Sequence, residues 1–144
     1  MRQVDKYGLG GESECVSTPD RILDISDSLA NTVDKLRDID GRSEDALKFF
    51  LDYYETVKQT NRILKPGQPI ALVVPNRTIS RVNIPTHRIT EEFYHFLGFD
   101  VKHTLPRDIP KKTLPFENTP ENVPGETGDL MAQEYILIMR APDW

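Results

Sequence analysis

The feature that most constrains the fold is a helix-to-strand junction in the middle of the chain. A helical stretch ends at Lys65-Pro66-Gly67, because Pro66 cannot continue the hydrogen-bond ladder and Gly67 tolerates a tight reversal. The uninterrupted apolar run from Ile70 to Val74 follows. Such a run is typical of a strand that is covered on both faces, as in a parallel sheet. The junction therefore predicts an α/β fold.

Apolar spacing and turn residues predict the elements around this junction. Three helices are expected, at residues 17–36, at residues 43–64 and from Thr86 or Thr90 to Leu97. Two further strands are expected at residues 99–105 and 134–140. Two loops are expected, a polar one at residues 77–85 and a proline-rich one at residues 106–133.

Composition places the chain among ordinary globular proteins. Its 144 residues suit one domain, with 38% hydrophobic and 28% charged residues. We expect residues 1–16 to be flexible and residues 17–144 to form the domain. A single cysteine, Cys15, excludes an intrachain disulfide and a cysteine-based metal site. No stretch is apolar enough to span a bilayer and the first residues lack a signal-peptide core, so a cytoplasmic location is expected.

The charge distribution is uneven. The net charge of −5 argues against nucleic acid as a partner. Between Arg77 and Lys112, however, seven basic residues stand against four acidic ones. Such a local excess can meet phosphate groups, and a mixed solvated surface is the alternative interpretation.

Six residues are candidates for nucleic-acid contacts. Asn76 and Arg77 follow the buried strand, at the end where open α/β sheets bind ligands. Phosphate or base contact is the functional interpretation, and a turn cap is the structural one. The others lie in or beside the proline-rich loop, with phosphate contact expected for the basic ones and base contact for the asparagine: Arg107, Lys111, Lys112 and Asn118. The three histidines show no metal-ligand spacing, so no metal site is predicted.

The order of elements and several motifs resemble the C-terminal portion of S-adenosylmethionine-dependent amino-group DNA methyltransferases. The resemblance covers residues 43–140. Its motifs are Phe49 to Tyr54, Arg62 to Gly67, Asn76-Arg77-Thr78, Arg107 to Lys112, and Met131 with Glu134-Tyr135-Ile136. It implies a three-layer, Rossmann-like α/β architecture in which this chain holds the last three strands and flanking helices. The final two strands would be antiparallel.

The resemblance also implies what this chain lacks. The family's glycine-rich cofactor turn and its Asn/Asp-Pro-Pro-Tyr/Phe catalytic motif are absent, so no catalytic or cofactor-binding residue is carried over. S-adenosylmethionine would be bound by the complete enzyme, not by this chain alone. The strand at residues 70–74 would have an unpaired edge, so a second polypeptide or dimer partner is expected to complete the sheet.

The resemblance further implies DNA as a partner, with RNA as the alternative. The chain would belong to an enzyme that methylates an exocyclic base amine. A non-catalytic nucleic-acid-binding or partner-regulating subunit is the alternative from another functional class, and a portion of an RNA methyltransferase is a third.

Overall fold

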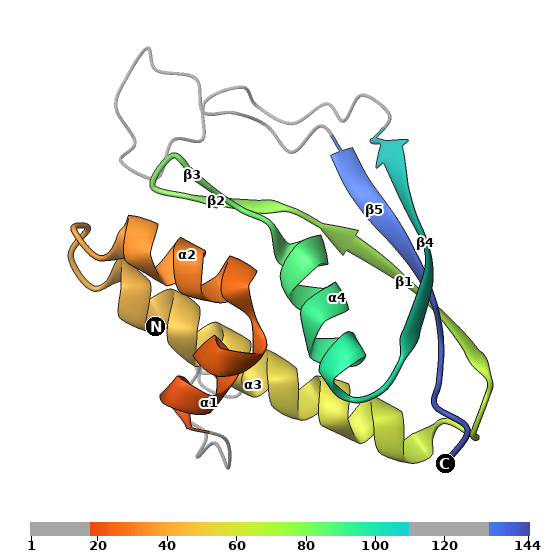
Figure 1. Ribbon diagram of the computed structural model, residues 1–144. Coiled ribbons are helices and arrows are strands. Elements are labelled where there is room, and N and C mark those ends of the chain that lie inside the picture. Colours follow the sequence, from red (N-terminus) through yellow and green to blue (C-terminus); the bar gives the residue numbers. More distant parts are fainter. Residues whose placement is uncertain (1–17, 110–132) are drawn as a thin grey trace, which may run out of the picture.

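The computed structural model describes residues 18–109 and 133–144. Their elements, in chain order, are α1 (Pro19–Ile25), α2 (Asp27–Leu36), α3 (Arg42–Ile63), β1 (Pro69–Pro75), β2 (Arg77–Ile79), β3 (Val82–Ile84), α4 (Thr86–Phe96), β4 (Asp100–Asp108) and β5 (Gln133–Arg140). Figure 1 shows the four helices on one side of the sheet formed by β1, β5 and β4. In the described part of the chain, no helix is both long and apolar enough to cross a membrane.

The last strand occupies the centre of this sheet. The order is β1-β5-β4, and β5 is antiparallel to both neighbours. β1 and β4 are therefore parallel to each other, so their carboxyl ends lie at the same edge of the sheet. The antiparallel pairing expected for the last two strands is confirmed. A mixed α/β structure is also confirmed, with a small sheet in which every strand pair is antiparallel.

The core lies between the sheet and the helices. Leu137 and Met139 of β5 are fully buried, as are Phe93 of α4 and Tyr54 of α3. The rings of Tyr54 and Phe93 lie 4.9 Å apart between their centroids, within the range in which aromatic side chains attract one another. Phe50 and Tyr53 of α3 also lie against Phe93, so aromatic side chains join α3 to α4.

The expectation that the first strand is covered on both faces was wrong for this chain. Ile70, Leu72 and Val74 are buried or half-buried, whereas Ala71 and Val73 are exposed, Val73 to 53%. The reason is that the helices cover one face of the sheet and that β1 pairs with β5 alone among the described strands. The sequence of β1 is nevertheless apolar on both faces.

The single helix expected at residues 17–36 is two helices, α1 and α2. Ser26 separates them in an extended conformation, and its hydroxyl accepts a hydrogen bond from the Leu29 N–H as the N-cap of α2. Glu92 of α4 reinforces this cap, because its carboxylate accepts hydrogen bonds from both hydroxyls of Ser26 and Ser28 and from the Ser28 N–H. The apolar residues keep their helical spacing on both sides of Ser26, so the sequence pattern did not indicate the break.

The second helix differs from its expected start by one residue. α3 begins at Arg42, and Gly41 at the N-cap has a positive φ of 66°. The expected stop is confirmed, since α3 ends at Ile63 and the chain reverses at Gly67 with φ 69°. The third helix, α4, begins at Thr86, the earlier of its two expected starts.

Both expected loops contain strands. Residues 77–85 form the hairpin β2–β3, whose two turn residues, Ser80 and Arg81, have positive φ values. Because such turns usually carry Gly or Asn, the sequence did not indicate a hairpin. The expected proline-rich loop at residues 106–133 overlaps two strands, since β4 extends to Asp108 and β5 begins at Gln133, and residues 110–132 lie outside the described part. Residues 1–16, expected to be flexible, lie outside the described part.

We predict that Glu92→Ala destabilises the fold by about 1–3 kcal/mol, because it leaves the Ser28 N–H and two hydroxyls without their acceptor. Glu92→Gln keeps one acceptor oxygen and should lose less. Urea unfolding measures both changes. Glu44→Ala, on the exposed first turn of α3, is the control. Equal losses for the alanine variants of Glu92 and Glu44 would contradict the assigned cap.

Candidate nucleic-acid interface

The fold gathers three of the predicted contact residues at one edge of the sheet. Asn76 and Arg77 directly follow β1, and Arg107 is close to the carboxyl end of the parallel strand β4. Pro75 and Arg107 both pair with Glu134, on opposite sides of β5. This arrangement agrees with the strand-end site predicted from the sequence. The other three candidates, Lys111, Lys112 and Asn118, lie outside the described residues.

Arg77 is held by an aromatic stack. Its guanidinium lies over the ring of Phe49, 5.1 Å from the centroid, within cation–π range. Phe49 in turn stacks on Tyr53 at 6.1 Å and 14°, and the Tyr53 hydroxyl is 3.1 Å from the Thr90 hydroxyl. The stack links α3, α4 and the hairpin. It holds one face of the guanidinium against an apolar surface and leaves its N–H edges available to an acceptor.

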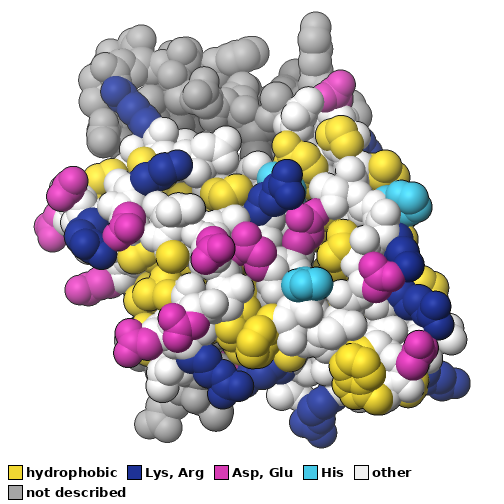
Figure 2. All heavy atoms as spheres, viewed as in Figure 1, with side chains coloured by type: hydrophobic (Ala, Val, Ile, Leu, Met, Phe, Trp, Pro, Cys, Tyr) yellow, Lys and Arg dark blue, Asp and Glu magenta, His cyan; other side chains and the backbone are white. Residues whose placement is uncertain are grey.

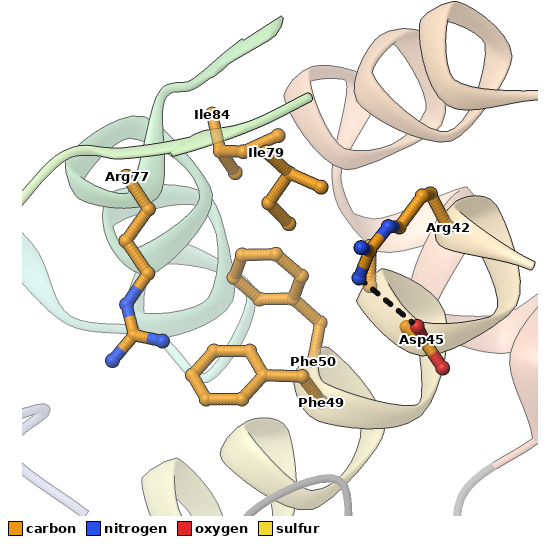
Figure 3. Close-up of a pocket in the computed structure, with 8 residues that line it drawn as sticks. Arg42, Asp45, Phe49, Phe50, Arg77, Ile79 and Ile84 are labelled. Atoms are coloured by element: carbon orange, nitrogen blue, oxygen red, sulfur yellow. Dashed lines mark ion pairs between the residues drawn. The ribbon is translucent and has the colours of Figure 1, made fainter. Parts of the chain in front are cut away.

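A shallow pocket opens beside this stack (Figure 3). Its volume is about 120 Å³. Phe49, Phe50 and Ile84 contribute apolar surface, while Arg77 and Arg42 lie on opposite sides in the close-up. Arg42 is paired with Asp45 at 3.7 Å, an exposed contact of small energetic value. The pocket is well below the roughly 300 Å³ of a small-molecule site, but two guanidinium groups beside it suit an anionic group such as a phosphate.

Asn76 has a structural role at the same edge. Its Oδ1 accepts hydrogen bonds from the backbone N–H of His87 at 3.4 Å and from the His87 Nδ1 at 2.7 Å. Since a backbone N–H can only donate, the shared atom is the amide oxygen, and Nδ1 therefore carries a proton. The His87 ring stacks on Tyr135 of β5, with centroids 3.7 Å apart. Asn76 thus ties the end of β1 to α4, and its amide nitrogen is the group left for a ligand.

Arg107 differs from Arg77 in its electrostatic surroundings. It forms an ion pair with Glu134 on the adjacent strand, through Nε at 2.7 Å and a second guanidinium nitrogen. The guanidinium is about half exposed, but its charge is largely balanced by this carboxylate. Arg77 has no ion-pair partner among the described residues, so it is the stronger candidate for phosphate.

Sequence reasoning missed two contributors to the site. They are Phe49, which the sequence placed only within a helix and a resemblance motif, and Arg42, which precedes that expected helix. Both lie at least 28 positions before Arg77, and no spacing rule connects them. More widely, Figure 2 shows Lys and Arg side chains interspersed with Asp and Glu on the viewed face, so the basic excess after residue 77 does not form one continuous patch there.

We predict that His87 makes stability depend on pH. Burial lowers the pKa of His87 below its ordinary value near 6.5. The negative charge of Glu91 partly offsets this decrease, and the positive charge of Arg88 adds to it. The unfolded chain therefore binds this proton at a higher pH than the folded chain does, and stability should fall as the pH drops below about 6.5. In urea unfolding at pH 7.5 and 5.5, His87→Asn should show a smaller decline than the unchanged chain. Identical declines would contradict this role of His87.

Comparison with known proteins gives one informative similarity. The chain is 29% identical over 145 aligned positions to the type II methyltransferase M.MvaI of Kocuria varians. The alignment takes in 97% of this chain but only 32% of that protein, so the chain spans about a third of the length of the relative it matches.

The aligned region is the C-terminal part of the relative, which confirms the resemblance to a portion of a DNA methyltransferase. No protein-family model matches the chain, and no solved structure matches it significantly. By sequence, the chain is therefore similar over nearly its whole length to the C-terminal third of a methyltransferase.

Proposed function

We propose that this chain is the C-terminal part or a subunit of a DNA methyltransferase that transfers a methyl group from S-adenosylmethionine to an exocyclic amino group of a base. In this proposal the chain contributes a wall of the cleft and contacts to the DNA backbone. The observation that carries the proposal is the similarity of 97% of the chain to the type II methyltransferase. The position of Arg77 at the carboxyl end of β1 supports it.

The sheet is consistent with the Rossmann-like architecture proposed for the whole enzyme. By the resemblance, β1, β4 and β5 would be the fifth, sixth and seventh strands of the methyltransferase fold. The antiparallel β4–β5 pair has the orientation expected for the last two. In the complete enzyme β1 would lie inside a larger sheet, which accounts for apolar residues on both of its faces.

The pocket beside Arg77 does not fit S-adenosylmethionine. The pocket beside Arg77 holds about 120 Å³, and its walls offer guanidinium groups, one carboxylate and apolar side chains. A nucleoside with a charged amino-acid tail requires a larger site. No catalytic step is therefore assigned to this chain. In the proposed enzyme the cofactor and the reacting amine would be held by residues outside it.

The proposed role of this chain is to position DNA through phosphate contacts. Arg77 would contact a phosphate from its aromatic support, and Arg42 would assist across the pocket. Arg107 would need to break its ion pair with Glu134 before it could contact a phosphate. Lys111, Lys112 and Asn118 extend the proposed contacts into the proline-rich segment, and the Asn76 amide nitrogen is a further candidate donor.

We predict that Arg77→Ala weakens binding to a duplex oligonucleotide about tenfold at low salt, the value of one charge-assisted contact. The slope of log affinity against log salt should fall by about one. Arg77→Lys keeps the charge but loses the planar stack, and should bind with intermediate affinity. Fluorescence anisotropy at several salt concentrations measures these effects.

The control for charge alone is Arg62→Ala. Arg62 lies at the opposite end of α3, about 30 Å along the helix from Arg42. Arg62→Ala removes the same charge as Arg77→Ala and should leave the affinity for DNA nearly unchanged. If Arg62→Ala and Arg77→Ala lose equal affinity, binding depends only on net charge and the proposed contact is wrong.

We also predict that the chain alone neither binds S-adenosylmethionine nor methylates DNA. Isothermal titration with the cofactor should show no heat of binding, and incubation with labelled cofactor and duplex DNA should transfer no label. Transfer by the purified chain would show that the catalytic residues lie within it. Arg77-dependent DNA binding with no methyl transfer, even when the rest of a methyltransferase is supplied, would favour the alternative, a non-catalytic binding subunit.

A further inference from the structure

The face of the sheet that points away from the helices is apolar at its centre. Two rows of paired residues cross it, Ala71–Ile138–His103 and Val73–Ile136–Leu105. Val73 is 53% exposed and Leu105 46%, although each lies in the interior of its strand rather than at an end. We call the five aliphatic residues of these rows the outer face: Ala71, Val73, Leu105, Ile136 and Ile138.

The side assignment follows from contacts made by the alternate residues. Thr104, next to Leu105, hydrogen-bonds Glu91 of α4. Tyr135, next to Ile136, stacks on His87 of the same helix. These side chains point toward the helices, so their neighbours point away from them. The Arg107–Glu134 ion pair borders the outer face at one end, and Arg140 borders it at the other.

The outer face continues into a free strand edge. β5 is the only described strand that pairs with β1, and Ala71 and Val73 lie on that unpaired strand. Pro69 and Pro75 occupy the two ends of β1, and proline cannot donate to a strand ladder. A pairing partner would therefore bind along the segment between them. An apolar face with charged ends beside an open edge has the anatomy of an interface, with an apolar centre and a polar rim.

We propose that the outer face and the β1 edge together bind the remaining part of the methyltransferase. This inference rests on the proposed function. The alignment leaves about two thirds of the relative without a counterpart here, so a large complementary polypeptide is the occupant that the comparison favours. It pairs a strand with β1 and packs apolar side chains on Val73, Leu105 and Ile136. The contact covers the second face of β1, whose sequence is apolar on both faces.

The test co-expresses the full 144-residue chain with a polypeptide that spans the part of the Kocuria varians methyltransferase outside the alignment. Size-exclusion chromatography with light scattering should show a one-to-one complex. Hydrogen exchange should be rapid along the β1 edge in the isolated chain and at least tenfold slower in the complex. Val73→Glu and Leu105→Glu should each weaken the complex tenfold or more.

The matched control is Ile63→Glu, which places the same charge on an 82% exposed isoleucine at the end of α3. Its complex should be as stable as that of the unchanged chain. Melting temperatures of all three isolated variants should stay near that of the unchanged chain, because each substituted side chain is substantially exposed. A lower affinity caused by misfolding would appear in this measurement.

Three results would overturn the proposal: no complex, equal weakening by Ile63→Glu, or a homodimer in which two outer faces pair. Failure of the proposed function can be told apart from failure of the docking surface. A complex that is lost in Val73→Glu but transfers no methyl group supports the docking surface and contradicts the activity. Arg77-dependent DNA binding without a complex contradicts the docking surface alone.

Discussion

The pairing of β5 between β1 and β4 is the constraint on which the rest of the structure depends. β5 comes from the end of the chain and joins two strands that are otherwise not paired with each other. Because it is antiparallel to both, the carboxyl ends of β1 and β4 meet at one edge. That edge brings Asn76 and Arg77 near Arg107, although 30 positions separate Arg77 and Arg107 in the sequence. The same pairing leaves β1 open on its other side, so the DNA-contact edge and the docking surface arise from one strand arrangement.

α4 connects the helical layer to this sheet. Near its start, His87 contacts Asn76 and stacks on Tyr135 of β5. In its middle, Glu92 caps α2 and Glu91 binds Thr104 of β4. Polar contacts of one short helix therefore determine the positions of α2, of the end of β1 and of the sheet. Asn76 was predicted to contact a ligand, but its side-chain oxygen is already bonded to His87 of this helix.

The two arginines at the edge show why a count of charges is a weak guide to binding. Arg77 and Arg107 contribute equally to the basic excess between residues 77 and 112. In the fold, Glu134 lies beside Arg107 on the adjacent strand and balances its charge, whereas Arg77 rests on Phe49 without an ion-pair partner among the described residues. The difference originates in strand register and in the packing of α3 against the hairpin. Neither can be derived from local composition, because the partners are distant in sequence.

The sequence by itself determined the helix stop at Lys65-Pro66-Gly67, the apolar strand after it, α4 and the last two strands, because these depend on local backbone preferences and on short-range periodicity. It also indicated the strand-end position of Asn76 and Arg77 and the resemblance to part of a methyltransferase. The break at Ser26 and the hairpin at Ser80 and Arg81 were hidden, since one depends on Glu92 and the other adopts positive φ without glycine. Only the tertiary structure decided which strand is central, which arginine has no acidic partner and which sheet face is exposed. These properties depend on contacts between residues far apart in the chain, where loop closure and packing rather than local preference select the partner.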